Sequence, residues 1–171
     1  MVDKSKFFFL QLPKFFPCLL YKVEQEYYIK VNFQLVKKLL IFMRYFTYTL
    51  YQQLLDLYGI DYIERLNRFE ISYNLLSLQL NSRVTLTTTL SEGQAISSIC
   101  SIFSNALWYE REVYDMFGIL FLDSKDLRRI LTDYGFKGHP MRKDFPLTGF
   151  IEIRYNDFGK RLKYESLNIF N

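Results

Sequence analysis

The clearest helical pattern in the first half of the chain begins after Asn32. Apolar residues follow at the three- and four-residue spacing that places side chains on one face of a helix. They are Phe33, Val36, Leu39, Leu40 and Met43. An asparagine directly before such a stripe can cap the first turn with its side-chain oxygen. The pattern therefore predicts a helix that starts after Asn32.

An alternating pattern, typical of strands, follows this helix. Residues 47–63 fit either a helix or a strand, but the alternation from Tyr58 to Tyr62 favours a strand that ends there. Between residues 69 and 90, two alternating runs are separated by a turn at Asn81-Ser82, which predicts a β-hairpin. The apolar phase shifts after Leu75, and we interpret this shift as a β-bulge.

Helical spacing returns after residue 90. Ser91 to Gln94 fits a capping box, and the apolar residues up to Phe103 predict a short helix after it. Asn105 can cap a further helix from 106 to 117, which Gly118 is placed to end. Cys100 is then most simply a core residue.

The last 54 residues show no sustained period, although they contain many aromatic residues. A structureless stretch of this length is unusual in a self-contained domain, so we expect it to be ordered by contact with a partner. The fold class predicted is α+β: a small sheet including a β-hairpin with helices packed on it, followed by a long irregular C-terminal segment. The predicted division is an extended N-terminal arm at 1–31, an α+β domain at 32–120, and an extended segment at 121–171 that docks on a partner.

Composition adds to this picture. Half of the residues are hydrophobic and 19% are aromatic, which excludes disorder over most of the chain. The bias toward Phe, Tyr, Ile, Lys and Asn over Gly, Ala and Pro indicates an AT-rich genome such as that of an organelle. The two cysteines have neither metal nor redox spacing, and no run is apolar enough to span a membrane. The basic and apolar N-terminus lacks a clear cleavage site, so an arm is favoured over a targeting signal.

The net charge of +4 is unevenly distributed along the chain. Residues 1–44 hold eight basic and three acidic groups, 45–120 hold four and eight, and 121–171 hold ten and seven. Basic ends around an acidic middle suit an acidic partner or nucleic acid, and they equally suit an ordinary solvated surface.

The segment 108–121, WYEREVYDMFGILF, places charges within an apolar frame. On a helix, Glu110 and Glu112 border the apolar arc, whereas Arg111 and Asp115 lie opposite it and can pair with each other. Carboxylates at the rim of a buried face need partners, because desolvating an unpaired charge costs several kcal/mol. Downstream basic residues supply candidates, so we predict that the later segment folds back onto this helix. These residues are Arg128, Arg129, Arg142 and Lys143.

The sequence offers little support for an active site of its own. Glu110 and Glu112 point about 160° apart on a helix, so they cannot face one substrate. The only histidine, His139, lies in no metal-binding motif, and no phosphate loop or nucleophile motif is present. For His139 we favour a hydrogen bond within a loop over a proton-handling or interface role near a partner's site.

With these motifs in view, the sequence resembles the 30-kDa subunit family of respiratory complex I, NADH:ubiquinone oxidoreductase. Three stretches carry the resemblance: WYEREVYDMFGILF, DLRRILTDYGFKGHPMRKDFPL and IEIRYND. It extends from about residue 32 to 157. Relatives continue beyond the position of Glu165 with an acidic, aromatic tail, so the contacts of that tail are in question here.

The resemblance implies a core structural subunit of the peripheral arm that carries no redox centre. It implies packing against the 49-kDa quinone-site subunit, with FMN, iron–sulfur clusters and ubiquinone in partner subunits. The complex transfers electrons from NADH to ubiquinone and translocates protons. The location implied is the matrix side of the mitochondrial inner membrane, with the gene in the organelle.

The family's motif residues map onto fifteen positions, whose implied role is to hold the C-terminal segment and the partner. They are Glu110, Arg111, Glu112, Asp115, Phe117, Gly118, Arg128, Arg129, His139, Pro140, Arg142, Lys143, Asp144, Phe145 and Pro146.

Two other classes of protein are weighed against this one. An RNA-binding component of an organellar ribosome would explain basic ends and many tyrosines, but the predicted domain is acidic. A small carboxylate hydrolase would need Glu112 for turnover in the isolated chain.

Overall fold

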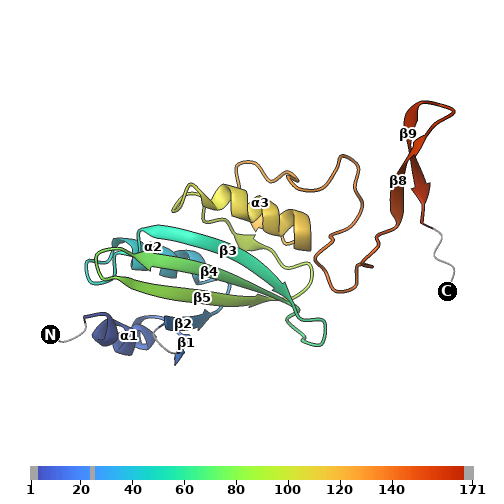
Figure 1. Ribbon diagram of the computed structural model, residues 1–171. Helices are drawn as coiled ribbons and strands as arrows, with labels where there is room; N and C mark the ends of the chain where they lie inside the picture. The colour runs from blue at the N-terminus through green and yellow to red at the C-terminus, as the bar shows by residue number, and fades with distance from the viewer. Residues whose placement is uncertain (1–3, 24–25, 168–171) are drawn as a thin grey trace.

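The fold is built on one five-stranded sheet with helices packed against it, as the computed structural model shows for residues 4–23 and 26–167 (Figure 1). The strands are β1 (Cys18–Val23), β2 (Glu26–Val31), β3 (Gln53–Asp61), β4 (Phe69–Ser77) and β5 (Ser82–Leu90). Their order across the sheet is β1-β2-β5-β4-β3. Only the β2–β5 pair is parallel among these neighbours. The mixture of sheet and helices confirms the α+β prediction.

The hairpin predicted at residues 69–90 is formed by β4 and β5. Its register runs without a break from Phe69 opposite Leu90 to Ser77 opposite Ser82. Asn81 takes a positive φ of 45° in the turn, which asparagine tolerates better than most residues. The predicted bulge at Leu75–Leu76 is wrong, because the irregularity lies on β3, between Leu54 and Asp56. In β4 the buried phase continues unbroken from Phe69 through Leu75 to Ser77, and Leu76 lies on the other face.

Helix α2 (Val36–Tyr45) confirms the first predicted helix, and its apolar stripe is buried against the sheet. The start of this helix differs from the prediction. Leu35 occupies the capping position, and the Asn32 side chain accepts the Gln34 N–H at 3.2 Å in the preceding turn. The strand predicted to end near Tyr62 is β3, which ends at Asp61.

Residues 4–23 and 26–31, the described part of the predicted arm, are not an extended arm, which corrects the predicted division of the chain. Helix α1 (Lys4–Phe15) is followed by β1 and β2, so this region is part of the α+β body. Phe9 and Leu12 are buried, and the Phe9 ring stacks on Tyr27 with centroids 3.9 Å apart. Burial of these apolar groups outweighs the disruption that Pro13 brings to the last helical turn.

The helix predicted between Gln94 and Phe103 is absent. A short strand β6 (Ile96–Ser97) runs parallel to β7 (Phe121–Leu122), and turns follow it. The Ser91 N–H does donate to the Gln94 side chain at 3.1 Å, as in a capping box. However, the Ser98 N–H donates to the Leu122 carbonyl at 2.8 Å, and this tertiary bond replaces a helical one.

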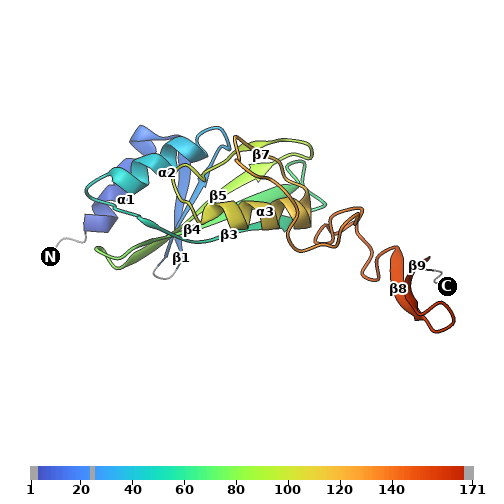
Figure 2. The same ribbon diagram turned by 90° about the horizontal axis from the view of Figure 1, so that it is seen from above.

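Helix α3 (Ala106–Phe117) confirms the last predicted helix and lies beside β3 (Figure 1). After β7 the chain follows an irregular path beside α3 and then enters a hairpin, β8 (Ile151–Asn156) and β9 (Arg161–Ser166). Both views show this hairpin projecting away from the body (Figures 1 and 2). Sequence periodicity did not predict the hairpin.

Candidate functional site

Helix α3 is buried on the predicted apolar face, at Val113 and Phe117, and also on the opposite, charged side, at Arg111 and Asp115. Trp108 is 63% exposed, whereas Glu110 and Asp115 are fully buried and Arg111 is almost so. Glu112 is exposed, and no hydrogen bond or ion pair from a described residue reaches it. The predicted pairing of Arg111 with Asp115 is wrong, because each of them binds a different loop. Buried charges of this kind must be matched by partners.

Glu110 holds the loop that follows β6. Its carboxylate accepts hydrogen bonds from the Ser98 hydroxyl and the Ile99 N–H, both at 2.8 Å, and from the Cys100 thiol at 3.2 Å. The predicted partner of Glu110 was an arginine, and these three donors bind it instead. Burial and the neighbouring carboxylate raise the pKa of the Cys100 thiol, which keeps this sulfur protonated. Glu110 therefore acts here as a structural acceptor.

Asp115 organises the segment that returns over α3. One of its carboxylate oxygens accepts the N–H groups of Ile130, Leu131 and Thr132 at 2.8–3.2 Å. The other accepts the Thr132 hydroxyl at 2.8 Å, and the Arg129 guanidinium lies 3.7 Å away. Burial opposes ionisation, but the hydrogen bonds from residues 130–132 outweigh it and lower the pKa of Asp115. A charged Asp115 thus fixes three consecutive backbone amides.

Arg111 and Arg129 hold the chain before and after residues 130–132. Arg111 binds the Asp126 carboxylate and donates to the Asp126 carbonyl at 2.8 Å. Arg129 donates to the carbonyls of Phe136 and Gly138 at 2.9 and 2.8 Å. Arg128 is 74% exposed in its side chain and forms an ion pair with Asp126, at 3.3 Å. The fold-back of the later segment is confirmed, although the ion pairs differ from those predicted.

A turn at residues 139–142 clasps the carboxyl end of α3. His139 Nδ1 lies 2.9 Å from the Asp115 carbonyl, the Met141 N–H donates to Met116 at 3.1 Å, and Arg142 Nε donates to Phe117 at 2.6 Å. These are three successive carbonyls that a helix leaves without internal partners. The positive charge of Arg142 at this end also interacts favourably with the helix dipole. The favoured interpretation of His139, a loop hydrogen bond, agrees with this geometry.

Gly118 makes this clasp possible. It ends α3 with φ = 75°, and its N–H donates to the Tyr114 carbonyl at 2.9 Å. A Cβ atom placed on it would lie 2.6 Å from His139 Nε2 and 2.7 Å from Arg142 Nη2. Both the backbone conformation and the space therefore require glycine.

A third buried carboxylate, Asp61, was missed by the sequence patterns. The Arg68 guanidinium binds it with two bonds of 2.7 and 2.8 Å, and the Lys143 N–H donates to it at 2.8 Å. Arg68 also binds Asp144, at 3.0 Å, and its hydrogen bonds lower the pKa of Asp61. The sequence pattern pointed the other way, because Asp61 lies in the polar phase of the alternation from Tyr58 to Tyr62, and that phase is the buried one at the end of β3.

The remaining predicted residues make contacts next to these buried carboxylates and the 139–142 turn. Phe145 packs between Phe136 and Phe150, and its ring lies 2.8 Å from where a Cβ atom on Gly138 would stand. Pro146 accepts the Gly149 N–H at 3.0 Å. Pro140 is partly buried within the clasp, and Phe117 contacts Gly59 of β3. Arg142 additionally binds Glu92, at 3.0 Å.

The hydrogen bonds and ion pairs of these buried carboxylates should be lost at low pH, and the fold should become less stable. The pKa of Asp61 and that of Asp115 are both lowered on folding, so each carboxylate stabilises the fold above its unfolded pKa of about 3.9. That stability is lost as pH falls through the lowered pKa. We expect a melting temperature that is constant from about pH 7 to 5 and falls below about pH 4. Calorimetry of the purified chain across this range measures it; a flat profile down to pH 3 would contradict the assignment.

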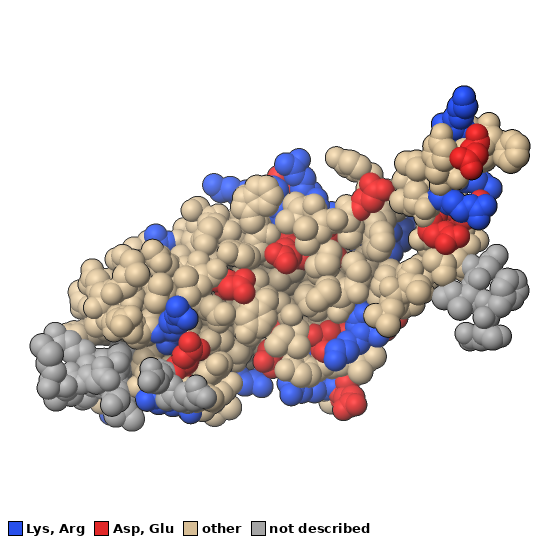
Figure 3. Space-filling view, viewed as in Figure 1, with Lys and Arg blue, Asp and Glu red and all other residues tan. Residues whose placement is uncertain are grey.

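The structure gives further findings on possible metal ligands, on the distribution of surface charge and on helix length. Within residues 4–23 and 26–167, no three His, Cys, Asp or Glu side chains are grouped to hold a metal ion. On the face seen in Figure 3, basic and acidic groups are interspersed and large areas are uncharged, whereas RNA-binding surfaces gather basic groups in a patch. No helix in the described part is long and apolar enough to cross a bilayer.

Known proteins share both the sequence and the fold. Residues 29–151 match the family described as the respiratory-chain NADH dehydrogenase 30 Kd subunit. NADH dehydrogenase [ubiquinone] iron-sulfur protein 3 of Beta trigyna is 49% identical over 92% of this chain and 82% of its own. The protein of the same name from Oryza sativa subsp. japonica is 53% identical over 77% of this chain and 69% of its own.

A solved structure shows the same fold at greater distance. A chain of the membrane-bound sulfane sulfur reductase, an archaeal respiratory membrane complex, superposes with a TM-score of 0.73 and 21% identity. The superposition covers 84% of this chain and 86% of that one. None of these similarities favours the RNA-binding alternative. The chain therefore belongs to the 30-kDa subunit family of respiratory-chain NADH dehydrogenase and is a subunit of respiratory complex I.

Proposed function

We propose that this chain is a rigid brace in the peripheral arm of complex I, which holds the neighbouring 49-kDa quinone-site subunit through residues 121–171. FMN, the iron–sulfur clusters and ubiquinone are held by partner subunits in this proposal. The composition bias and the plant relatives support a place on the matrix side of the mitochondrial inner membrane, with the gene in the organelle genome. The chain contributes to electron transfer and proton translocation by positioning its neighbours.

The observation that carries the proposal is the uncovered apolar face of the β8–β9 hairpin. Ile153 pairs with Tyr164, and Tyr155 pairs with Leu162. Because alternate residues share a face, these four side chains lie together with Ile151. All five are more than half exposed. An isolated two-stranded hairpin is marginal in water, so this face is expected to be covered by a partner.

The segment that leads to the hairpin is held against the body of the protein, as expected of a rigid structural subunit. Asp115, Arg111 and Asp61 hold residues 126–143 through the contacts described above. At the same time, large apolar side chains of this path face outward. Tyr134 and Leu147 are fully exposed, and Met141 is 57% exposed. A segment fastened on one side and apolar on the other supports docking to a second subunit.

The opposite face of the hairpin provides a matched control. Glu152, Arg154, Lys163 and Glu165 alternate with the apolar residues, and Lys163 pairs with Glu165 at 2.9 Å. This face has the composition of a solvated surface. Substitutions on the two faces therefore change the same hairpin while altering different surfaces.

We expect the double variant Ile153→Thr with Tyr164→Thr, which keeps β-forming residues at a cross-strand pair, to lower the amount of assembled complex at least about tenfold, the consequence of losing roughly 1.4 kcal/mol of docking free energy. Native gels stained for NADH oxidation measure assembly. The variant Arg154→Gln, on the charged face, should assemble normally. The melting temperature of the isolated chain should be unchanged in both. Full assembly of the double variant would refute the hairpin as the docking element.

A further inference from the structure

The two edge strands of the main sheet, β3 and β1, differ in the hydrogen bonds that they receive from the rest of the chain. At the β3 edge, α3 covers the strand with side-chain hydrogen bonds. Asn105 donates to the Leu54 carbonyl at 2.8 Å, and the Tyr109 hydroxyl donates to the Leu55 carbonyl at 3.0 Å. At the β1 edge, no described residue outside β2 makes a hydrogen bond with Cys18–Val23. Natural proteins rarely leave an edge open without a protective device.

Strand β1 has few of the usual protections of an open edge. All six of its residues pair with β2 in a regular register without a bulge. It contains no proline and one charged residue, Lys22. Leu19, Tyr21 and Val23 are 69%, 47% and 50% exposed. A regular apolar edge of this kind is a template for another strand.

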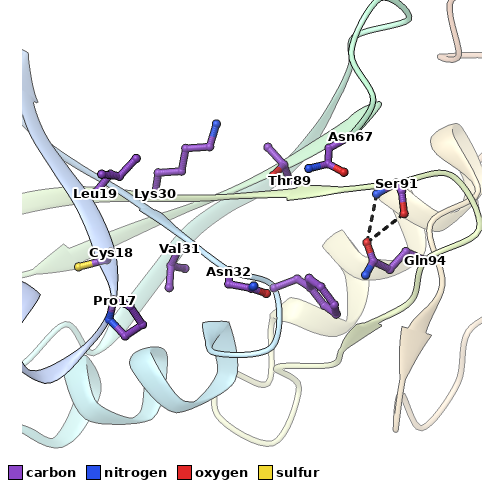
Figure 4. Close-up of a pocket in the computed structure, with 11 residues that line it drawn as sticks. Pro17, Cys18, Leu19, Lys30, Val31, Asn32, Asn67, Thr89, Ser91 and Gln94 are labelled. Atoms are coloured by element: carbon purple, nitrogen blue, oxygen red, sulfur yellow. Dashed lines mark hydrogen bonds between the residues drawn. The ribbon is translucent and has the colours of Figure 1, made fainter.

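A groove lies beside the first residues of this strand. It has a volume of about 650 Å³ and lies between the ends of β1, β2 and β5 (Figure 4). Cys18 and Leu19 line one side, and Asn67 and Thr89 line another, as the close-up shows. A chain running along β1 would reach this groove at the start of the strand. Its mixed apolar and amide lining suits a side chain of a peptide better than a charged cofactor.

Charge indicates the kind of segment that fits. Residues 1–44 carry a net charge of +5. Within the described part, no carboxylate forms an ion pair with Lys14, Lys22 or Lys30. Lys30 lies directly opposite Leu19 and lines the groove. An acidic partner would find complementary charge along this edge.

We propose that β1 is a docking edge for an extended, acidic segment of another complex I subunit, which adds as a sixth strand and enters the groove with one end. Main-chain hydrogen bonds to β1 supply affinity, and Leu19, Tyr21 and Val23 pack against alternate side chains of the added strand. Lys22 and Lys30 favour carboxylates in that strand. This contact is separate from the C-terminal hairpin, so either can fail without the other.

Two measurements on the intact complex test the proposal. A photo-reactive benzoylphenylalanine at Leu19 should cross-link to one acidic peptide of one other subunit, identified by mass spectrometry. The same group at Leu66, which is 98% exposed in the β3–β4 loop, is the control and should not give that product. In the unmodified protein, the amides of Cys18–Val23 should exchange hydrogen at least about tenfold more slowly in the complex than in the free chain.

Each alternative result counts against the proposal. A cross-link to a second copy of this chain would make the edge a self-association surface, and a cross-link to lipid would make it a membrane contact. Absence of a cross-link at Leu19, or unchanged exchange of the β1 amides on assembly, would show an unoccupied edge. The exchange experiment needs no substitution, so a folding defect cannot obscure its result.

Discussion

Asp115→Ala is expected to lower the free energy of unfolding of the purified chain by about 3 kcal/mol, because it leaves three backbone amides and the Thr132 hydroxyl without their acceptor. The carboxylate is fully buried and accepts hydrogen bonds from Ile130, Leu131, Thr132 and the Thr132 hydroxyl. Denaturant unfolding measures the loss. The segment that Asp115 holds should also become more accessible, so trypsin should cut faster after Lys125, Arg128 and Lys137.

Glu112→Ala is the matched control on the same helix. It removes a carboxylate three residues away, but Glu112 is exposed. Its substitution should change the unfolding free energy by less than about 0.5 kcal/mol. Equal effects of the two substitutions would mean that Asp115 does not anchor residues 130–132. An unchanged rate of trypsin cleavage in Asp115→Ala would also show that Asp115 does not anchor residues 130–132.

Gly118→Ala is expected to destabilise the chain by about 3 kcal/mol through two separable causes. The first is backbone strain, because φ is 75° at this position. The second is a clash, since the new methyl group would lie within 2.7 Å of both His139 and Arg142. Relief of the clash requires the 139–142 turn to leave the end of α3. Assembly of the complex should therefore fall together with stability.

Gly93→Ala separates these causes. Gly93 has nearly the same φ, 78°, but a Cβ built there meets no described atom within 4 Å beyond its chain neighbours. This variant should lose only about 1–2 kcal/mol, the strain of a left-handed alanine. The difference between the two variants then reports the contact of Gly118 with the clasp. If both lost the same free energy, the close approach of His139 and Arg142 would be irrelevant to stability.

Local patterns were reliable where one element decides its own structure. The spacing of Val36, Leu39 and Met43 predicted α2, and the alternation from Phe69 to Leu90 predicted the β4–β5 hairpin. Gly118 ended α3 as predicted. In each case, burial of one regular apolar face and the local backbone preference agree.

The same reasoning failed where contacts distant in sequence outweigh local preference. The capping signal at Ser91 predicted a helix, but Glu110 takes the Ile99 N–H and Leu122 takes that of Ser98. On α3, Val113 and Phe117 are buried as apolarity predicts, but Asp115 on the opposite side is buried as well. The helix buries its charges because the returning chain provides amides and guanidinium groups for them.

The α+β class, the main hairpin, two helices, the family resemblance and the return of the tail to α3 could all be predicted from local patterns and motifs in the chain. The three-dimensional fold was needed to show which groups meet there. It paired Asp61 with Arg68 and Lys143, placed the turn of His139 and Arg142 on the end of α3, and made the N-terminal residues part of the sheet. The physical reason is that periodicity reports which face of one element is apolar, whereas a buried carboxylate is stabilised by donors that the fold brings from elsewhere in the chain.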